Sequence, residues 1–278
     1  MKEYSKILYI IPGIIIICYL SIGFIPNLSA VDKIAPQWLA MTILNGISIL
    51  FLLNNRKSFS ISISNTLKST MSITYIGFIL WASLSYFYAI NPTEVIVNIT
   101  RQANVMLMYL LMAIFLFSFK QKIEFVCWVV IVILGIEVYA ILIEAQNMLN
   151  SEGIIKSAGL KGVTANRNIT AFSVAIKIPF VLFLFETVKK NIIKAILLAI
   201  TSLSFLCLSM IQSRASFIGV GIIIIGYLGI NIFLFYRERV KYNLLKSGYV
   251  IFPLLLAILV NQTYFSSRGA DALSRAAT

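Results

Sequence analysis

The chain has 278 residues, of which 60% are hydrophobic and only 12% are charged. Its mean hydropathy is +0.93. A soluble domain cannot hide this much apolar surface, because a helix that is apolar on all sides needs lipid or a large core around it. The formal net charge of +13 does not indicate a nucleic-acid-binding protein, because the basic residues lie in short loops between apolar stretches. We therefore expect an all-α protein, a polytopic helical bundle in a membrane.

The cysteine and histidine content limits the chemistry that the chain can perform. Cys18, Cys127 and Cys207 all lie inside apolar stretches. We interpret them as packing residues rather than as a disulfide framework or a metal site. Because the chain has no histidine, it cannot supply a His-based catalytic triad, a His proton relay or the usual zinc site.

Hydropathy predicts about nine membrane spans that form a single transmembrane domain over residues 1–278. They lie near residues 7–25, 36–53, 71–90, 104–119, 125–144, 170–187, 193–211, 215–236 and 248–263. The first apolar run is longer than the core of a signal peptide, so we interpret it as an uncleaved span. Polar stretches at 54–70 and 91–103 are expected to be loops.

Lysine and arginine are distributed unequally between the two sides of these spans. The larger share lies on the side of the N-terminus, which predicts that the N-terminus is cytoplasmic. The longest polar segment, 145–169, then forms an outward-facing loop, and the polar tail 264–278 also faces outward. Several outward arginines lie close to span ends. Each could anchor a helix at lipid headgroups, whereas together they suggest an anion-binding surface at the outer leaflet.

The segment from Gly159 to Pro179 leads from a basic loop directly into an apolar span. Its donors are suited to an anionic group: Lys161, Asn166, Arg167 and Asn168. The alternative role of this segment is helix capping, by Asn168 or by Thr170. Capping would also point a helix N-terminus outward, where an anion is favoured.

Lys177 lies about two turns below the outer end of the sixth span, counted at about 1.5 Å of rise per residue. A charge at that depth is costly, so it is expected to be paired or to face water. Glu137 lies at a similar depth in the preceding span. Lys177 therefore either forms an ion pair with Glu137 or lines a polar cavity that opens outward.

Arg214 stands in a very short connection, Gln212 to Arg214, between two predicted spans. Tight turns favour Gly, Asn or Ser, so an arginine there calls for a reason. Bidentate binding of a phosphate group by the guanidinium is one reason. Contact with lipid headgroups is the alternative.

Three short motifs, in this order along the chain, resemble the O-antigen ligase and O-antigen polymerase superfamily of bacterial membrane glycosyltransferases. They are Asn91-Pro92-Thr93-Glu94 with Arg101, Thr164-Ala165-Asn166-Arg167-Asn168, and Ser213-Arg214-Ala215. The resemblance extends over nearly the whole chain in the order of its spans. The chain departs from the family pattern at Arg167, where proline is commoner between the two asparagines.

The resemblance implies an enzyme of the bacterial inner membrane that builds cell-surface polysaccharide. Such enzymes transfer a saccharide, with inversion, from an undecaprenyl-diphosphate carrier to an acceptor hydroxyl at the outer face. Ligases use the lipid A core of lipopolysaccharide as the acceptor, and polymerases use another lipid-linked repeat unit. No metal or nucleotide cofactor is implied. Arg214 is the first candidate for holding the diphosphate, with Arg101 and Arg167 next.

The family pattern continues into a large outward loop with further catalytic residues and more spans. This chain ends at Thr278, about where that loop would begin. We therefore expect a truncated protein that is inactive alone. Glu94, Glu152 and Asp271 could face outward, but nothing in the sequence singles out one of them as a general base.

A second hypothesis is a secondary transporter or flippase for an anionic or lipid-linked solute. Transporters often contain inverted repeats and charged or broken helices at the midplane. No such repeat is visible in this sequence, and the outward cations gather at one face.

Overall fold

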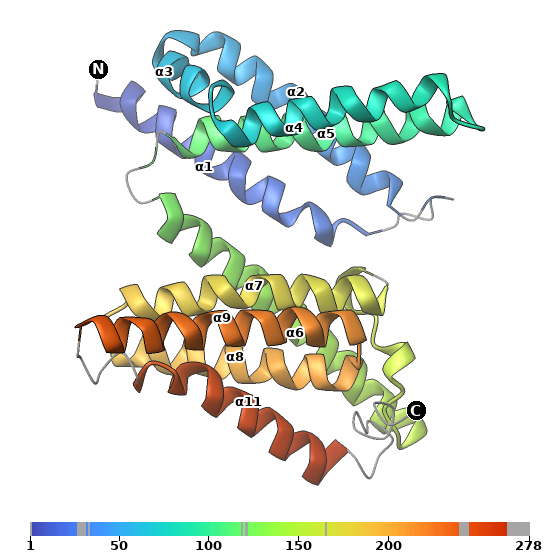
Figure 1. Ribbon diagram of the computed structural model, residues 1–278, viewed down its shortest axis with the longest axis vertical. Helices are drawn as coiled ribbons and strands as arrows, with labels where there is room; N and C mark the ends of the chain where they lie inside the picture. The colour runs from blue at the N-terminus through green and yellow to red at the C-terminus, as the bar shows by residue number, and fades with distance from the viewer. Residues whose placement is uncertain are drawn as a thin grey trace. The chain divides into compact units, whose positions relative to one another are not determined.

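The computed structural model describes residues 2–26, 32, 34–117, 119, 122–164, 166–238 and 245–265. Every regular element within these ranges is a helix (Figure 1). The chain folds into two compact units, Met1–Ile123 and Glu124–Thr278. Each unit is described by itself below.

Seven of the described helices are long and apolar enough to cross a membrane. They are α2 (Ala35–Asn54), α4 (Thr70–Ser83) continued by η2 (Leu84–Phe87), α5 (Pro92–Leu116), α6 (Lys122–Glu152), α7 (Arg167–Thr187), α8 (Asn191–Ile211) and α9 (Arg214–Glu238). Shorter apolar helices occupy Ile10–Phe24 and Gly248–Thr263. The predicted all-α fold is confirmed, and the long apolar helices suit a multi-pass membrane protein. The number of nine spans and the side of the N-terminus stay predictions.

The first unit is organised around α5, which packs against α1 (Lys2–Ser21), α2, α3 (Arg56–Leu67) and α4. Phe51, Phe59 and Phe115 meet edge to face where α2, α3 and α5 come together, with ring centroids 5.8–6.0 Å apart. Aromatic pairs prefer this arrangement because the positive edge of one ring faces the negative face of another. The cluster therefore holds α2, α3 and α5 together where they meet.

A chain of polar side chains joins α1, α2 and α5 within their apolar stretches. The Tyr19 hydroxyl donates to Asn45 Oδ1 (2.6 Å), and Asn45 Nδ2 donates to Asn104 Oδ1 (2.5 Å). Asn104 Nδ2 in turn donates to Thr42 Oγ1 (2.9 Å). Polar groups that pair between helices supply contact energy where the lipid offers no hydrophobic driving force. This network therefore helps to hold the three helices together.

The prediction of loops at 54–70 and 91–103 in the first unit is wrong. The polar stretch 54–70 folds mostly into α3, and residues 92–103 form the first turns of α5. The helix begins at Pro92 because Asn91 caps it, accepting from the Glu94 amide (3.4 Å), and proline suits the first helical position. Arg101 consequently lies within a helix.

The second unit consists of α6, α7, α8, α9 and α11 (Gly248–Val260), followed by the short η5 (Asn261–Phe265). Within it α7 packs against both α8 and α9, and α11 packs against α8 (Figure 1). Its core contains fully buried side chains from α6, α7 and α8, among them Leu134, Ile178 and Leu197. Phe185 stacks on Tyr249 with ring centroids 4.4 Å apart.

The predicted outward loop 145–169 is shorter than expected, because α6 continues to Glu152. The connection that follows contains two turns of 3₁₀ helix, η3 (Ser157–Gly159) and η4 (Gly162–Thr164), and it ends where α7 begins. The predicted outward tail 264–278 lies outside the described residues from position 266 onward.

Candidate functional site

The sites predicted around Arg167 and Arg214 lie at the same end of the second unit. Helices α7 and α9 are joined by the antiparallel α8, so they run in the same direction, side by side (Figure 1). The Tyr227 hydroxyl hydrogen-bonds to Glu186 (3.0 Å), which fixes their relative height. We counted residues from this bond back to the first residue of each helix, at about 1.5 Å of rise per residue. The first residues of α7 and α9 are offset by about 9 Å along the helix axes.

The N-terminus of α7 is capped by Asn166. Its Oδ1 accepts from the backbone amides of Asn168 (3.0 Å) and Ile169 (3.4 Å). The sequence predicted capping in this segment but assigned it to Asn168 or Thr170, which is wrong. The Asn166 backbone is extended, as an N-cap residue requires, whereas Asn168 already lies inside the helix. Both asparagine side chains are exposed.

The basic loop before α7 is held in place by Glu144, near the end of α6. Its Oε2 accepts from the backbone amides of Lys161 (2.9 Å) and Gly162 (2.7 Å). The Thr170 hydroxyl, from α7, donates to the Lys161 carbonyl and lies 2.7 Å from the Thr164 hydroxyl. These bonds connect the loop to both helices, so the exposed Lys161 side chain projects from a fixed backbone.

The sequence did not indicate this role of Glu144. The one local signal was Gly162, which has a φ of +54°. A Cβ atom there would lie 2.8 Å from Thr170 Cγ2. A glycine is therefore needed for its backbone conformation and for the close approach of the loop to α7.

The turn before α9 has an unusual conformation. Gln212 adopts a left-handed conformation with φ of 55° and closes the C-terminus of α8. Its Nε2 is buried without a hydrogen-bond partner. Residues other than Gly rarely adopt this backbone conformation, because it is strained. Strained backbone conformations concentrate at functional sites. The turn places Arg214, with an exposed side chain, as the first residue of α9.

Ion pairing separates the candidate cations into two groups. Among the described residues, Lys161, Arg167 and Arg214 form no ion pair. Four other cations do, each with one carboxylate: Arg101 with Asp32, Lys156 with Glu152, Lys177 with Glu137, and Lys246 with Glu186. The first three sit at the end where α7 and α9 begin. Helix N-termini favour anions through their free amides and the helix dipole, so this end of the second unit can attract an anionic group.

Lys177 is not part of that group of cations. Its ammonium lies 2.9 and 2.8 Å from the two oxygens of Glu137 on α6, and it also donates to Ser173 Oγ and to the Ser173 carbonyl. Of the two alternatives for Lys177, the structure contains the ion pair. Because an ammonium has three donors, these partners leave none for a substrate.

Arg101 belongs to the first unit and has partners of its own. Its Nη2 donates to Asp32 Oδ2 (2.8 Å), and its guanidinium lies 5.8 Å from the centre of the Trp38 ring. The side chain is still 38% exposed, beside a cavity of about 430 Å³ that Trp38 and Asn104 also line. The expectation that Arg101 holds the diphosphate together with Arg167 and Arg214 stays a prediction.

Metal-ligating residues do not cluster in the part of the chain that the structure describes: no group of three or more Cys, Asp or Glu side chains there could hold an ion. Comparison of the chain with protein-family models, with curated proteins and with solved structures finds no match. These comparisons assign no family. The resemblance to the O-antigen ligase and polymerase superfamily therefore rests on the three motifs alone.

Proposed function

We propose that the end of the second unit where α7 and α9 begin binds the diphosphate of a polyprenyl-linked saccharide in a bacterial inner membrane. In this proposal the protein serves saccharide transfer to an acceptor hydroxyl, as in the O-antigen ligases and polymerases that its motifs resemble. One observation carries the proposal. Arg167 and Arg214 are the first residues of two parallel, neighbouring helices, and neither has an ion-pair partner among the described residues.

The proposed chemistry needs positive charge where this arrangement supplies it. In the transfer, the bond between the anomeric carbon and the diphosphate oxygen breaks, and the acceptor oxygen bonds to that carbon on the opposite face. Negative charge grows on the departing diphosphate. Guanidinium groups stabilise that charge through paired N–H donors, and so do two helix N-termini. The residue that takes the acceptor proton is not assigned.

Binding of a prenyl diphosphate by the purified chain tests this proposal. The probe is geranylgeranyl diphosphate, and geranylgeraniol, which has the same prenyl chain and no charge, is the reference ligand. We expect Arg214→Ala and Arg167→Ala each to weaken diphosphate binding by about tenfold or more, because a hydrogen bond to a charged group is lost. Binding of the alcohol should not change.

Arg237→Ala is the matched control, because Arg237 is exposed and lies in the last turn of the same helix as Arg214. In cells whose polysaccharide synthesis depends on the complete protein, Arg214→Ala should abolish the polysaccharide product while the protein remains in the membrane. Equal loss of diphosphate affinity in the Arg237 variant, or unchanged affinity in the Arg214 variant, would contradict the proposal.

A secondary transporter or flippase for an anionic or lipid-linked solute is the second candidate. The Lys177–Glu137 pair favours it, because charged residues inside spans often mark a solute or ion path. Uptake of a labelled prenyl diphosphate into vesicles that contain the protein distinguishes the two. Flipping without saccharide transfer would support the transporter.

A further inference from the structure

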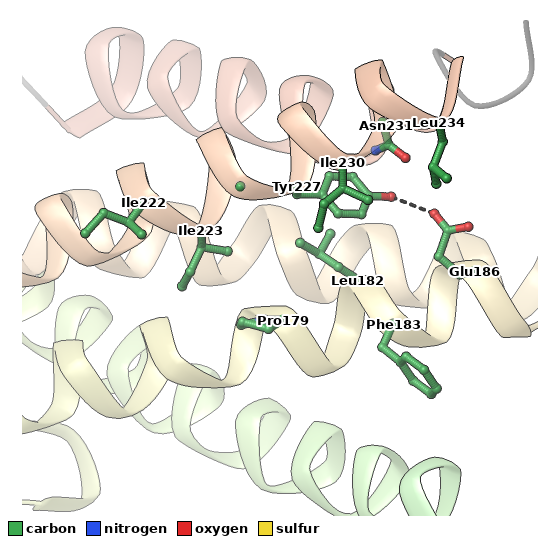
Figure 2. A pocket seen from close by; sticks show the side chains of 11 residues that line it. Pro179, Leu182, Phe183, Glu186, Ile222, Ile223, Tyr227, Ile230, Asn231 and Leu234 are labelled. Atoms are coloured by element: carbon green, nitrogen blue, oxygen red, sulfur yellow. Dashed lines mark hydrogen bonds between the residues drawn. The ribbon is translucent and has the colours of Figure 1, made fainter. Parts of the chain in front are cut away.

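An apolar groove lies between α7 and α9 in the second unit and encloses a cavity of about 470 Å³ (Figure 2). The carboxylate that lines it, Glu186, accepts from the Tyr227 hydroxyl (3.0 Å) and pairs with Lys246. That charge is balanced within the protein, so the groove does not select an occupant by charge. The first unit contains a cavity that does.

This second cavity, of about 430 Å³, lies between α2 and α5. Its lining residues fall within 35–42 of α2 and 100–107 of α5, which is about 10 Å along each helix at 1.5 Å per residue. The two helices run in the same direction, because the residues that pair between them advance along both helices together. The cavity therefore begins beside the Asp32–Arg101 ion pair and continues along two helices that are apolar enough to cross a membrane.

The ion pair at the mouth of this cavity keeps unused hydrogen-bonding capacity on both of its sides. Arg101 Nη2 donates to Asp32 Oδ2 (2.8 Å), and Asp32 Oδ1 accepts from the Ile34 amide (3.1 Å). A guanidinium has five N–H donors and a carboxylate has about four acceptor positions, so several remain open among the described residues. The Arg101 and Asp32 side chains are 38% and 44% exposed, so a ligand can reach both of them.

The two charges together select the kind of ligand that can bind here. A purely anionic group is attracted by Arg101 but repelled by Asp32, whose charged atoms lie only 2.8 Å apart, and a purely cationic group meets the reverse. A group that carries both charges, joined by a short linker, gains from both side chains. Asp32 lies just before α2, which begins at Ala35. The ion pair therefore lies at the end of a candidate span, at the level of lipid headgroups.

We propose that this cavity binds a zwitterionic phospholipid that carries a primary ammonium, as phosphatidylethanolamine does. The phosphate accepts N–H bonds from Arg101, and the ammonium donates to Asp32. Further along the cavity, Thr42 and Asn104 form polar walls that suit the glycerol esters, and the apolar Leu107 suits the start of an acyl chain. The site lies in the first unit and does not depend on the proposed function. A polyprenyl diphosphate is disfavoured here, because its negative charges would face the Asp32 carboxylate.

Native mass spectrometry of the chain in mild detergent tests the proposal. The probes are dioleoyl lipids that differ only in the headgroup: phosphatidylethanolamine, phosphatidylglycerol and phosphatidylcholine. The wild-type chain should retain one phosphatidylethanolamine per copy and bind it about fivefold or more tightly than the other two lipids. Phosphatidylglycerol lacks the ammonium, and the choline nitrogen has no N–H donor for Asp32. Equal retention of the three lipids would overturn the proposal.

Two variants that remove one charge each distinguish recognition of charge from support of the fold. Asp32→Asn leaves Arg101 unopposed, so the preference should move to phosphatidylglycerol. Arg101→Gln leaves the carboxylate alone, so retention of phosphatidylethanolamine should fall at least fivefold and that of phosphatidylglycerol should not rise. An exposed ion pair contributes little to stability, so both variants should fold.

Glu152→Gln is the control for these variants, because it removes the same charge from an exposed ion pair with Lys156 in the second unit. It should keep the preference for phosphatidylethanolamine. An unchanged preference in Asp32→Asn, or the same change of preference in Glu152→Gln, would overturn the proposal.

A third pair of variants tests the place of binding. In Ala103→Leu a larger side chain fills the cavity, and in Gln102→Leu the same side chain is placed at the exposed neighbouring position, outside the lining residues. We expect Ala103→Leu to lower retention of phosphatidylethanolamine at least tenfold and Gln102→Leu to leave it unchanged. Equal retention in the two variants would overturn the proposal.

Soluble competitors separate the lipid from other ligands that carry a phosphate. Glycerophosphoethanolamine has the same headgroup without acyl chains, so it should not displace the lipid at an equal concentration, because burial of the chain adds to the affinity. Geranylgeranyl diphosphate has a chain and no ammonium, and it should not displace the lipid either. Displacement by the first would assign the site to a free headgroup, and displacement by the second would assign Arg101 to the diphosphate. Either result would overturn the proposal.

Discussion

The Glu137 carboxylate on α6 and the Lys177 ammonium on α7 form an ion pair at 2.8 Å, and the side chains are only 8% and 14% exposed. The Ser173 hydroxyl donates to the same carboxylate at 2.8 Å. Two consecutive helices are thus joined near mid-span by a cluster in which each charge has a partner. The energetic consequence of such a cluster appears when one charge is removed, because the other is left buried and unpaired.

A double-mutant cycle tests this coupling. Lys177→Met and Glu137→Leu should each destabilise the chain by about 3–5 kcal/mol, because each leaves an uncompensated buried charge. The double variant should recover most of the loss. Thermal unfolding in detergent gives the four stabilities. Losses that add without recovery would show that the two side chains act independently.

Gly162→Ala should destabilise the loop before α7. Alanine at φ +54° is strained by about 1–2 kcal/mol, and its Cβ would also press on Thr170. Gly153→Ala is the control, because Gly153 has a φ of +71° but open space around its Cβ. Thermal unfolding should therefore show a larger loss for Gly162→Ala. Equal losses would mean that the contact with Thr170 contributes nothing.

Glu144→Ala should release the basic loop from α6. The Lys161 and Gly162 amides would lose the charged acceptor that they share, at a cost of about 1.5–3 kcal/mol. Hydrogen exchange should then accelerate at these two amides. In the control Glu152→Ala, an exposed pair with Lys156 is lost, so exchange at Lys161 and Gly162 should not change. Unchanged exchange in Glu144→Ala would contradict the anchoring role.

Gln212→Gly should stabilise the turn between α8 and α9. Glycine adopts the left-handed conformation without steric cost, so we expect a gain of about 1 kcal/mol, reduced by the greater freedom of the unfolded chain. The same change removes a buried amide without a partner. Thermal unfolding measures the effect. A loss of stability would show that the Gln212 side chain supports the turn.

Prediction from the sequence succeeded where a local property decides the structure. The length and apolar character of segments such as 193–211 and 215–236 mark α8 and α9 closely. It failed at 54–70 and 92–103, where polar residues continue a helix. Hydropathy measures the free energy of transfer from water to lipid. Helix α5 begins at Pro92 because Asn91 caps it and proline suits the first helical position, and neither effect contributes to hydropathy.

The same distinction between local signals and long-range contacts holds for the candidate site. Motif position placed Arg167 and Arg214 in polar segments directly before predicted spans, because a basic loop and a short polar turn are local signals. The residue that caps α7 was assigned wrongly, since the cap is Asn166. The role of Glu144 could not be found, because the two backbone amides that donate to it lie 17 and 18 positions further along the chain. The apolar groove beside Tyr227 likewise depends on how α7 packs against α9.

The sequence by itself determined that this protein is helical, suited to a membrane and rich in cations at the ends of its spans, because hydrophobicity, charge and capping act over a few residues. Only the tertiary structure decided which cations are neutralised. Lys177 and Arg101 are engaged by Glu137 and Asp32, while Arg167 and Arg214 form no ion pair among the described residues. Pairing depends on distances across packed helices, which residue spacing along one chain does not specify.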